Sequence, residues 1–363
     1  MGPGPAVAQL RTAVRLCLAD LAPANPPPAD LSPGALAAGG VPASALVLVA
    51  CSGGADSLAL AAAAAFVAPR LGLRVGGVTV DHGLQPGSAE RAAGVAALLA
   101  GLGLDPVRSV AVAVPPAGGG AGPEAAARAV RYHALDAAAR DYHAAALLLG
   151  HTLDDQAETV LLGLARGSGG RSLAGMAARR GCYRRPLLAV RRAVTRDACT
   201  ELGLEPWQDP HNSDFRYARA RVRHQALPAL ETALGPGVAE ALARTASLLR
   251  ADAECLDELA FAESGQLRGD CSDPAGLGAG WLRALPAAIR TRVLRDAAIM
   301  AGCPHGALTA GHVGAVDALV TDWHGQRWVD LPGGLRASRR AGKVWFTSTG
   351  AGKSEGSESV GRN

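Results

Sequence analysis

The sequence predicts an α/β fold, a doubly wound parallel sheet followed by a smaller, mainly helical domain. Apolar runs at residues 45–51, 74–80, 107–114 and 144–150 alternate with segments of helical pattern. This alternation is typical of parallel strands joined by crossover helices. Polar motifs directly follow several of the runs, and ligands of such sheets bind at the carboxyl ends of the strands. Beyond residue 227 the pattern is mostly helical, which gives the second domain.

A chain of 363 residues is long enough for two or three domains. The second domain is expected to hold helices at 237–264, 281–301 and 309–321 and a small β-meander at 326–346. We expect four regions along the chain: 1–44, an N-terminal helix and irregular lead-in; 45–225, the catalytic domain; 226–346, the mainly helical domain with its β-meander; and 347–363, a disordered tail.

The composition is that of a soluble globular protein, with 49% hydrophobic and 19% charged residues. The seven cysteines are scattered and include no C-x-x-C pair, which indicates a reducing compartment and argues against a structural zinc or iron–sulfur site. No signal peptide is recognisable, and the longest apolar stretch, Leu58–Pro69, is too short to span a bilayer. We therefore expect a cytoplasmic location and no membrane partner.

The predicted strand at Leu46–Cys51 runs directly into a short loop, which we call the phosphate loop. It consists of Ser52, Gly53, Gly54, Ala55, Asp56 and Ser57. Its two glycines allow the backbone to curl so that several N–H groups face one point at the positive end of the next helix, an arrangement that binds phosphate. The serines add hydroxyl donors, and Asp56 adds a carboxylate suited to Mg2+. No lysine follows the glycines, so the loop is not of the Walker A type, and an ordinary Gly-rich turn is the plain alternative.

Two further motifs follow predicted strands. The second strand ends at Asp81 and His82, and the last one runs into Gly150 and His151. Three acidic residues stand in the helix after that strand: Asp154, Asp155 and Glu158. Thr152 is suited to cap this helix, and acids in its first turn complement the helix dipole. Capping explains one or two of the acids, but a metal and substrate site explains the whole group better, and Mg2+ prefers oxygen ligands to histidine.

A predicted helix after the Gly-rich break at 117–122 carries Glu124, Arg128 and Arg131 at positions i, i+4 and i+7. This spacing puts the three side chains on one face, where Glu124 and Arg128 are placed for a salt bridge. A solvated surface pair is the alternative for these residues taken alone.

Positive charge is concentrated in one segment. The whole chain has a net charge of +4, but residues 166–223 hold 13 arginines and five acids, a local balance of +8. On a helix Arg216, Arg219 and Arg223 share one face, and in an extended chain Arg219, Arg221 and Arg223 do. Either geometry presents a row of guanidinium groups and indicates a polyanionic partner. The alternative is a solvated surface, because arginine is the usual cation of this lysine-poor chain.

Taken in order, these motifs resemble those of the tRNA(Ile)-lysidine synthases, a family of PP-loop ATP pyrophosphatases with a sheet of the adenine nucleotide alpha hydrolase type. The Ser-Gly-Gly-x-Asp-Ser loop at 52–57 indicates the broad PP-loop class. The narrower family is indicated by Asp-His-Gly-Leu at 81–84, Glu-x-x-x-Arg at 124–128, Gly-His-x-x-Asp-Asp-Gln-x-Glu-Thr at 150–159, Arg-Gly-Ser-Gly at 166–169, Arg-Pro-Leu-Leu at 185–188 and the segment 209–223. Gln85 and Ala220 depart from the Arg and Asn usual in the family, which affects contacts near the substrate and leaves the ATP site unchanged.

The resemblance implies the chemistry. ATP adenylates the C2 oxygen of cytidine 34 in the CAU anticodon of an isoleucine tRNA, and the ε-amine of free L-lysine then displaces AMP to form lysidine. The cofactors implied are ATP and Mg2+, the partners are tRNA(Ile) and lysine, and a homodimer stays open.

The resemblance also implies roles for individual residues. Catalytic roles fall on Asp56, Asp154, Asp155 and Glu158, with Asp56 and Asp155 as metal ligands. ATP contacts are expected from Ser52, Gly53, Gly54, Ala55, Asp56, Ser57, Asp81, His82, Gly150 and His151. Substrate contacts are expected from Glu124, Arg128, Arg131, Arg185, Arg219, Arg221 and Arg223.

Two other functions stay open on the sequence. A PP-loop tRNA sulfurtransferase uses the same adenylation but delivers sulfur, and members that act on cytidine commonly carry C-x-x-C cysteines, which this sequence lacks. A non-catalytic RNA-binding protein explains the arginines but not the phosphate loop with its convergent acids. Formation of AMP and pyrophosphate from ATP, tRNA and lysine discriminates between an enzyme and a binding protein.

Overall fold

The computed structural model describes residues 2–23, 44–83, 85–113, 123–167, 169–209, 213–268, 276–304 and 306–349. The chain forms two compact units. Unit 1 comprises Met1–Arg166 and Ala174–Ser247, and unit 2 comprises Gly167–Leu173 and Leu248–Asn363. The domain boundary expected at 225/226 stays a prediction. No helix among the described residues is both long and apolar enough to span a membrane.

Unit 1 is built on a six-stranded sheet in the order β3-β2-β1-β4-β6-β5. Its strands are β1 (Leu46–Ala50), β2 (Arg74–Asp81), β3 (Val107–Ala111), β4 (Ala146–Leu148), β5 (Arg179–Arg180) and β6 (Tyr183–Arg184). The pairs β1–β2, β1–β4, β2–β3 and β4–β6 are parallel, and β5–β6 is antiparallel. The four predicted strands and the mainly parallel sheet are confirmed.

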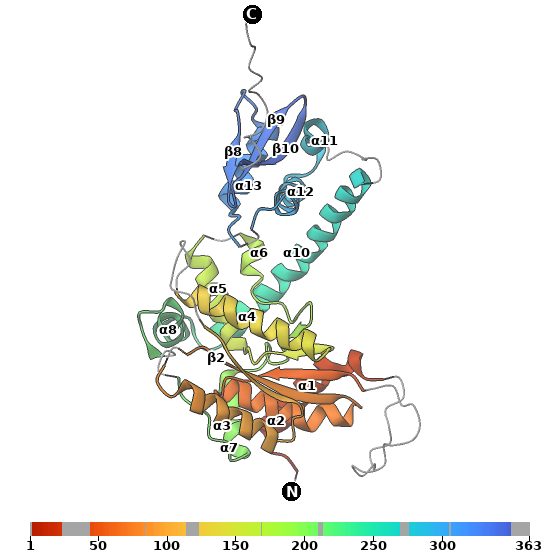
Figure 1. Cartoon of the computed structure of the whole chain (residues 1–363). Helices are drawn as coiled ribbons and strands as arrows, with labels where there is room; N and C mark the ends of the chain where they lie inside the picture. Colours follow the sequence, from red (N-terminus) through yellow and green to blue (C-terminus); the bar gives the residue numbers. More distant parts are fainter. Residues whose placement is uncertain are drawn as a thin grey trace, which may run out of the picture. The chain divides into compact units, whose positions relative to one another are not determined.

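Helices cover both faces of this sheet, as a doubly wound fold requires (Figure 1). The helices of unit 1 are α1 (Pro5–Leu18), the short η1 (Ala19–Leu21), α2 (Ala55–Arg70), α3 (Ser88–Gly101), α4 (Pro123–Asp141), α5 (Leu153–Ala165), α7 (Arg192–Glu201), α8 (Ala218–Arg221), the π-helical turn η3 (Val222–Ala226) and α9 (Leu227–Leu234). Because side chains of a strand alternate in direction, β1 serves two cores. Val47 and Val49 belong to the core with α1, α2 and α7, whereas Leu46 and Leu48 belong to the core with Leu135 of α4.

The strand order changes direction beside β1. Strands β2 and β3 extend the sheet on one side of β1, and β4 lies on its other side. Such a switch point is where open α/β sheets bind their ligands. The phosphate loop follows β1 and the Gly150–Glu158 motif follows β4, so the fold brings the two motifs to the switch point.

Unit 2 contains a four-stranded antiparallel sheet in the order β7-β10-β9-β8, which shares a hydrophobic core with helices. Its elements are α6 (Gly170–Leu173), β7 (Leu277–Gly278), α11 (Ala279–Ala284), α12 (Ala287–Met300), α13 (Ala310–Thr321), β8 (Val329–Leu331), β9 (Leu335–Arg340) and β10 (Lys343–Ser348), while α10 (Val238–Arg268) contributes residues to both units. The predicted β-meander is confirmed.

The structure corrects one predicted helix. It describes only the first and last residues of the predicted lead-in and the first residues of the predicted tail. The single helix predicted at 281–301 is wrong, because Pro286 separates α11 from α12, and proline disfavours the helical conformation of the residue before it. Residues 24–43 of the predicted lead-in and 350–363 of the predicted tail lie outside the described residues, whereas Thr347 and Ser348 belong to β10.

Candidate active site

The phosphate loop is held in its curled shape by its own hydrogen bonds. Ser57 Oγ accepts a hydrogen bond from the Ser52 amide at 3.2 Å and donates one to the Gly54 carbonyl oxygen at 2.9 Å. Gly53 has a φ of +82°, which disfavours other residues, and an added Cβ would lie 2.8 Å from Val95 Cγ2. No side chain among the described residues caps the N-terminus of α2. Its first backbone N–H groups therefore suit the phosphates of a nucleotide.

Gly150 brings the second motif against this loop. A Cβ at Gly150 would lie 3.0 Å from the backbone oxygen of Asp56 and 3.2 Å from the Cα of Ser57. A larger residue would push the two segments apart, so the glycine permits a close approach of β4 and α2. The loop and the α5 motif are thus neighbours, as the sequence predicted.

Thr152 caps α5, as predicted. Its Oγ1 accepts from the Asp155 amide at 3.4 Å, and Asp155 Oδ2 accepts from Thr152 N and from Thr152 Oγ1, each at 2.9 Å. These reciprocal bonds form a capping box. One oxygen of Asp155 is therefore committed to the helix end, and the other faces the arginines described next.

The carboxylates of Asp56, Asp154, Asp155 and Glu158, here called the acidic cluster, converge on a residue that the sequence motifs do not mark, Arg192. Its guanidinium lies 2.7 Å from Asp155 Oδ1, 3.1 Å from Glu158 Oε1 and 3.4 Å from Asp56 Oδ2. Its backbone amide donates to Asp154 Oδ2 at 2.7 Å. Burial lowers the pKa of Arg192, but Asp155, Glu158 and Asp56 outweigh burial and raise it above its ordinary value. Arg192 is therefore a permanent cation within the acidic cluster.

Asp56 is the member of the acidic cluster that belongs to the phosphate loop. Its side chain is 25% exposed, and its Oδ1 accepts a hydrogen bond from Thr195 Oγ1 on α7. Burial raises the pKa of Asp56 and the neighbouring Asp155 adds to the rise, while Thr195 and Arg192 oppose it. The Oδ2 atom has the longer, 3.4 Å contact with Arg192.

A Mg2+ ion fits Asp56 better than Asp155, because the Oδ2 atom of Asp56 has only the 3.4 Å contact with Arg192. Both Asp155 oxygens are engaged, Oδ2 by Thr152 and Oδ1 by Arg192 and Arg223. The described residues include no group of three His, Cys, Asp or Glu side chains arranged to hold a metal ion. Mg2+ commonly binds through one or two carboxylates together with substrate phosphates, and Asp56 offers one carboxylate beside a phosphate site. The arrangement thus favours Asp56 as the metal ligand, and the metal role expected of Asp155 stays a prediction.

Two of the arginines expected to face a polyanion instead face the acidic cluster. Arg223 contacts Glu158 Oε1 at 2.7 Å and Asp155 Oδ1 at 3.2 Å, and Arg219 Nε lies 3.6 Å from Glu158 Oε2. The Glu158 side chain is 0% exposed, and a buried carboxylate is stable only with such partners. The predicted shared face of Arg219 and Arg223 is therefore present, but α8 and η3 turn it toward the acidic cluster.

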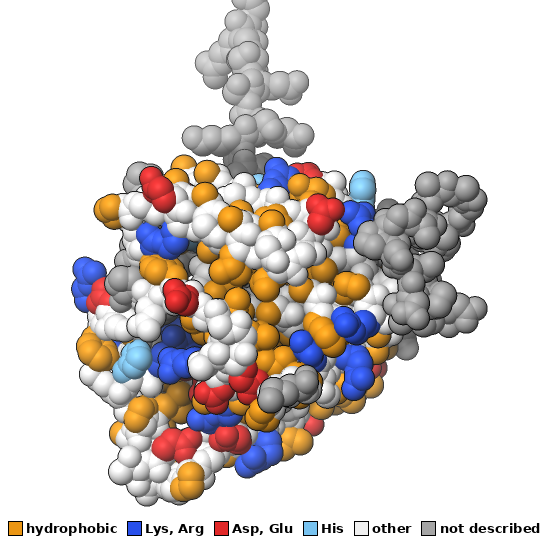
Figure 2. Space-filling view, turned by 90° about the horizontal axis from the view of Figure 1, so that it is seen from below, with side chains coloured by type: hydrophobic (Ala, Val, Ile, Leu, Met, Phe, Trp, Pro, Cys, Tyr) orange, Lys and Arg blue, Asp and Glu red, His pale blue; other side chains and the backbone are white. Residues whose placement is uncertain are grey.

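Besides Arg216, the exposed member of the predicted row is Arg221. Its guanidinium donates to the carbonyl oxygens of Phe215 at 2.6 Å and Arg216 at 2.9 Å. Arg216 in turn pairs with Asp214 at 2.7 Å. On the face shown in Figure 2, basic, acidic and hydrophobic side chains are intermingled and form no continuous basic patch. The local excess of arginine thus does not create a basic surface on that face.

Two histidines lie at the carboxyl ends of β2 and β4. The Nδ1 atoms of His82 and His151 are buried and have no hydrogen-bond partner among the described residues. Burial lowers the pKa of both rings, that of His151 to about 3, so both are neutral near pH 7. Buried polar atoms ordinarily have partners, so these two nitrogens suit contacts with a bound nucleotide. Asp81, unlike the two histidine nitrogens, has a partner: its Oδ1 accepts a hydrogen bond from the Gly83 amide at 2.9 Å.

Three more arginines act on His151. Burial has the largest effect on the pKa of that ring, and the positive charges of Arg185, Arg128 and Arg131 lower it further. Arg185 is buried and donates to the Ala177 carbonyl oxygen at 2.8 Å. Burial and Arg128 lower the pKa of Arg131 itself. Glu124 belongs to α4, but its side chain lies outside the described part of the chain, so its pairing with Arg128 stays a prediction.

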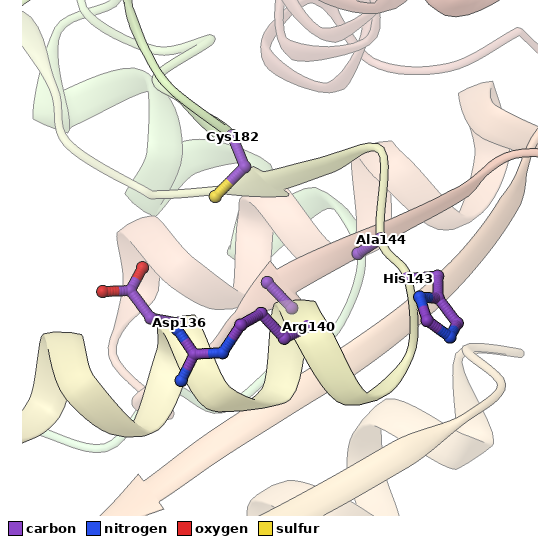
Figure 3. Close-up of a pocket in the computed structure, with 6 residues that line it drawn as sticks. Asp136, Arg140, His143, Ala144 and Cys182 are labelled. Atoms are coloured by element: carbon purple, nitrogen blue, oxygen red, sulfur yellow. The ribbon is translucent and has the colours of Figure 1, made fainter.

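The pocket in Figure 3 lies away from these motifs. It has a volume of about 470 Å3 and is lined by Asp136, Ala139, Arg140, His143, Ala144 and Cys182. These residues come from α4 and from the segments that precede β4 and β6, which puts the pocket at the amino ends of the strands. Ligands of parallel sheets bind at the opposite ends, so we place the candidate active site at the switch point.

The chain is similar to known proteins over most of its length. Residues 37–230 match the family model of the PP-loop domain, and residues 280–345 match that of the TilS substrate binding domain. The chain is 60% identical to a tRNA(Ile)-lysidine synthase of Thermobifida fusca, over 94% of this chain and 98% of that protein. It is 56% identical to one of Streptomyces coelicolor, over 95% and 99%.

A solved structure shares the fold. The U34-tRNA thiolase NcsA from Methanococcus maripaludis superposes with a TM-score of 0.52 at 18% identity, over 68% of this chain and 80% of that chain. At this identity the likeness shows the fold alone.

Proposed function

This chain belongs to the tRNA(Ile)-lysidine synthase family, and on that premise we propose that it joins lysine to C2 of cytidine 34 in the CAU anticodon of tRNA(Ile). The reaction converts ATP to AMP and pyrophosphate. One observation carries the proposal: the phosphate loop after β1 and the acidic cluster on α2 and α5 meet at the switch point of the sheet. The first suits a nucleotide, and the second suits the amino group of lysine.

The first step activates the cytidine. Its C2 oxygen attacks the α-phosphate of ATP, the bond between the α- and β-phosphates breaks, and pyrophosphate leaves. The N-terminus of α2 and the hydroxyl of Ser52 supply donors for the phosphates, while the Ser57 hydroxyl holds the loop through its bond to the Gly54 carbonyl oxygen. We assign Asp56 to a Mg2+ ion bound with ATP, which supplies positive charge against the phosphates. Neutral His82 and His151 are assigned to the nucleotide because their Nδ1 atoms are buried and unpartnered among the described residues.

The second step forms the C–N bond. The lysine ε-amine attacks C2, the bond from C2 to the activated oxygen breaks, and AMP leaves with that oxygen. An amine attacks only in its neutral form, so a base must take its proton. We assign recognition and deprotonation of lysine to Asp154, Asp155 and Glu158, which neighbouring arginines already contact with N–O distances of 2.7 to 3.6 Å. Lysine thus enters a site whose charge is largely balanced.

Sulfur transfer is not favoured by the thiols near the site. Cys51 Sγ lies 3.5 Å from Ser57 Oγ, and Cys199 Sγ lies 3.5 Å from the Ala55 carbonyl oxygen. Burial raises the pKa of both thiols, that of Cys199 to about 11. The thiolate is the reactive form of cysteine, so both thiols are unreactive near neutral pH.

Contacts with tRNA, location and assembly belong to the proposal as well. We assign tRNA contacts to Arg128, Arg131, Arg185 and Arg221, and to Glu124 on the same helix as the first two. A cytoplasmic location follows from the substrates, because tRNA, ATP and free lysine meet there. A homodimer is testable by the molar mass of the protein in solution.

The test of the proposal is the dependence of AMP and pyrophosphate formation on the two other substrates. We expect both products with ATP, lysine and the CAU-anticodon tRNA(Ile), and neither with a tRNA whose position 34 is uridine. AMP formation that ignores the nucleotide at position 34 would contradict the proposal.

A further inference from the structure

Arg192 connects parts of the site that come from different elements. Its Nε reaches Asp56 on α2, whereas its Nη1 and Nη2 reach Glu158 and Asp155 on α5, so each of its three guanidinium nitrogens faces a carboxylate. Its side chain is only 12% exposed. Because the guanidinium is planar and its donors are fixed in a fork, such contacts set the relative positions of the carboxylates.

The first turn of α7 reinforces this connection. The Arg192 backbone amide donates to Asp154 at 2.7 Å, and Thr195 Oγ1 donates to Asp56 and lies 2.8 Å from the Arg192 carbonyl oxygen. Residues of one helical turn thus contact every member of the acidic cluster. The proposed reaction gives this turn no other role.

Other arginines still neutralise the buried carboxylates of Glu158 and Asp155 when Arg192 is replaced, so the effect of Arg192 on position can be tested apart from its effect on buried charge. Glu158 keeps its partners Arg223 at 2.7 Å and Arg219 at 3.6 Å when Arg192 is replaced. Asp155 keeps Arg223 and the Thr152 cap. In the described part of the chain no such substitute bridges Asp56 to Asp155 and Glu158 on α5, so replacement of Arg192 removes this bridge selectively.

We propose that Arg192 is a positioning residue for the ligation, which holds the Asp56 carboxylate of the phosphate loop at a fixed spacing from the carboxylates of Asp155 and Glu158. It thereby aligns the half of the site that binds the nucleotide with the half that binds lysine. The inference rests on the proposed function. A misplacement of reacting groups by about 1 Å lowers rates by about a hundredfold, so the alignment has a measurable effect.

The structure also raises a competing role. Arg192 contacts the same carboxylates that are assigned to lysine, so Arg192 and the lysine ammonium would compete if the guanidinium had to leave first. The two roles predict opposite changes in the KM for lysine. Loss of a competitor lowers the KM, whereas loss of a positioning group raises it.

The experiment compares Arg192→Gln and Arg192→Lys with Arg196→Gln, an exposed arginine of the same helix as the matched control. Initial rates of lysidine formation give kcat and the KM for lysine, and circular dichroism and ATP binding check that each variant is folded. We expect Arg192→Gln to lower kcat about a hundredfold and to raise the KM for lysine. Arg192→Lys should recover part of both losses, because its ammonium keeps the charge without the fork. Arg196→Gln should match the wild type.

Several outcomes overturn the inference. A lower KM for lysine in Arg192→Gln means competition. Equal decreases of kcat in both Arg192 variants at unchanged KM mean a merely structural residue. Wild-type kinetics in Arg192→Gln mean no role at all. If the wild-type protein makes no lysidine, the proposed function fails. If the wild type makes lysidine and the Arg192 variants show one of the outcomes above, only the inference fails.

Discussion

Replacement of Glu158 tests whether the contacts between the acidic cluster and its arginines stabilise unit 1. The Glu158 side chain is 0% exposed and accepts hydrogen bonds from Arg223 at 2.7 and 3.0 Å and from Arg192 at 3.1 Å. Alanine at this position leaves three guanidinium groups, those of Arg192, Arg219 and Arg223, without this carboxylate. Removal of one partner of a buried ion pair costs about 3–5 kcal/mol. We expect the loss of stability in Glu158→Ala to lie toward the lower end of this range. The side chains of Arg192 and Arg223 are 12% and 19% exposed, so water can hydrate them when the carboxylate is removed.

Urea unfolding followed by circular dichroism measures this change. The matched control is Asp141→Ala, which breaks the 2.6 Å pair between Asp141 and Arg108, whose side chains are 53% and 40% exposed. Such an exposed pair contributes about 0–1 kcal/mol. We therefore expect a clearly lower urea midpoint for Glu158→Ala than for Asp141→Ala. Equal midpoints for the two variants would refute the view that the Glu158 contacts stabilise unit 1.

Three further predictions concern the site. Asp56→Asn should lower AMP production by about a hundredfold or more while tRNA binding stays near wild type, because it removes the carboxylate assigned to the metal; activity within a few-fold of wild type excludes that assignment. Burial raises the pKa of Asp155, but Arg192, the Thr152 amide, His151 and Arg223 together lower it below its ordinary value. Its charge therefore stabilises the fold fully above pH about 4, and this stabilisation is lost as the pH falls through the lower folded-state pKa. The stability advantage of the wild type over Asp155→Asn should shrink in urea titrations below pH about 4, and an advantage that is constant with pH contradicts the assignment. Arg221→Ala should weaken tRNA binding and flatten the log–log salt slope by roughly 0.7–0.9 without changing ATP binding; an unchanged slope means that Arg221 makes no phosphate contact.

The fold was predictable because its signals are local. The alternation of apolar and helical segments gives the strands, and the Gly-Gly pair after Leu46–Cys51 gives the strand-to-helix turn. The capping role of Thr152 was predictable for the same reason, since it depends on residues three positions apart. The helix break at Pro286 was predictable too, because a proline within a helical pattern indicates a helix boundary. The apolar periodicity continues on both sides of Pro286, and for that reason a single helix was predicted.

The composition of the site was only partly predictable because its contacts are long-range. Asp56 and Arg192 are 136 residues apart in the chain, and Arg192 is one of 13 arginines in its segment. A count of charges cannot distinguish an arginine that enters a cluster of carboxylates from one that faces solvent. The same limitation applies to the predicted row of arginines, because periodicity gave a shared face for Arg219 and Arg223 but not what that face contacts.

The central claim is that the site at the switch point transfers lysine to cytidine 34. It is tested most directly by the mass of the modified nucleoside after reaction of the wild-type protein with ATP, isotopically labelled lysine and the CAU-anticodon tRNA(Ile). We predict that cytidine 34 gains the mass of labelled lysine minus water, and that the gain shifts with the label. An unmodified cytidine, or a gain that matches sulfur in place of oxygen and is independent of the label, would contradict the claim.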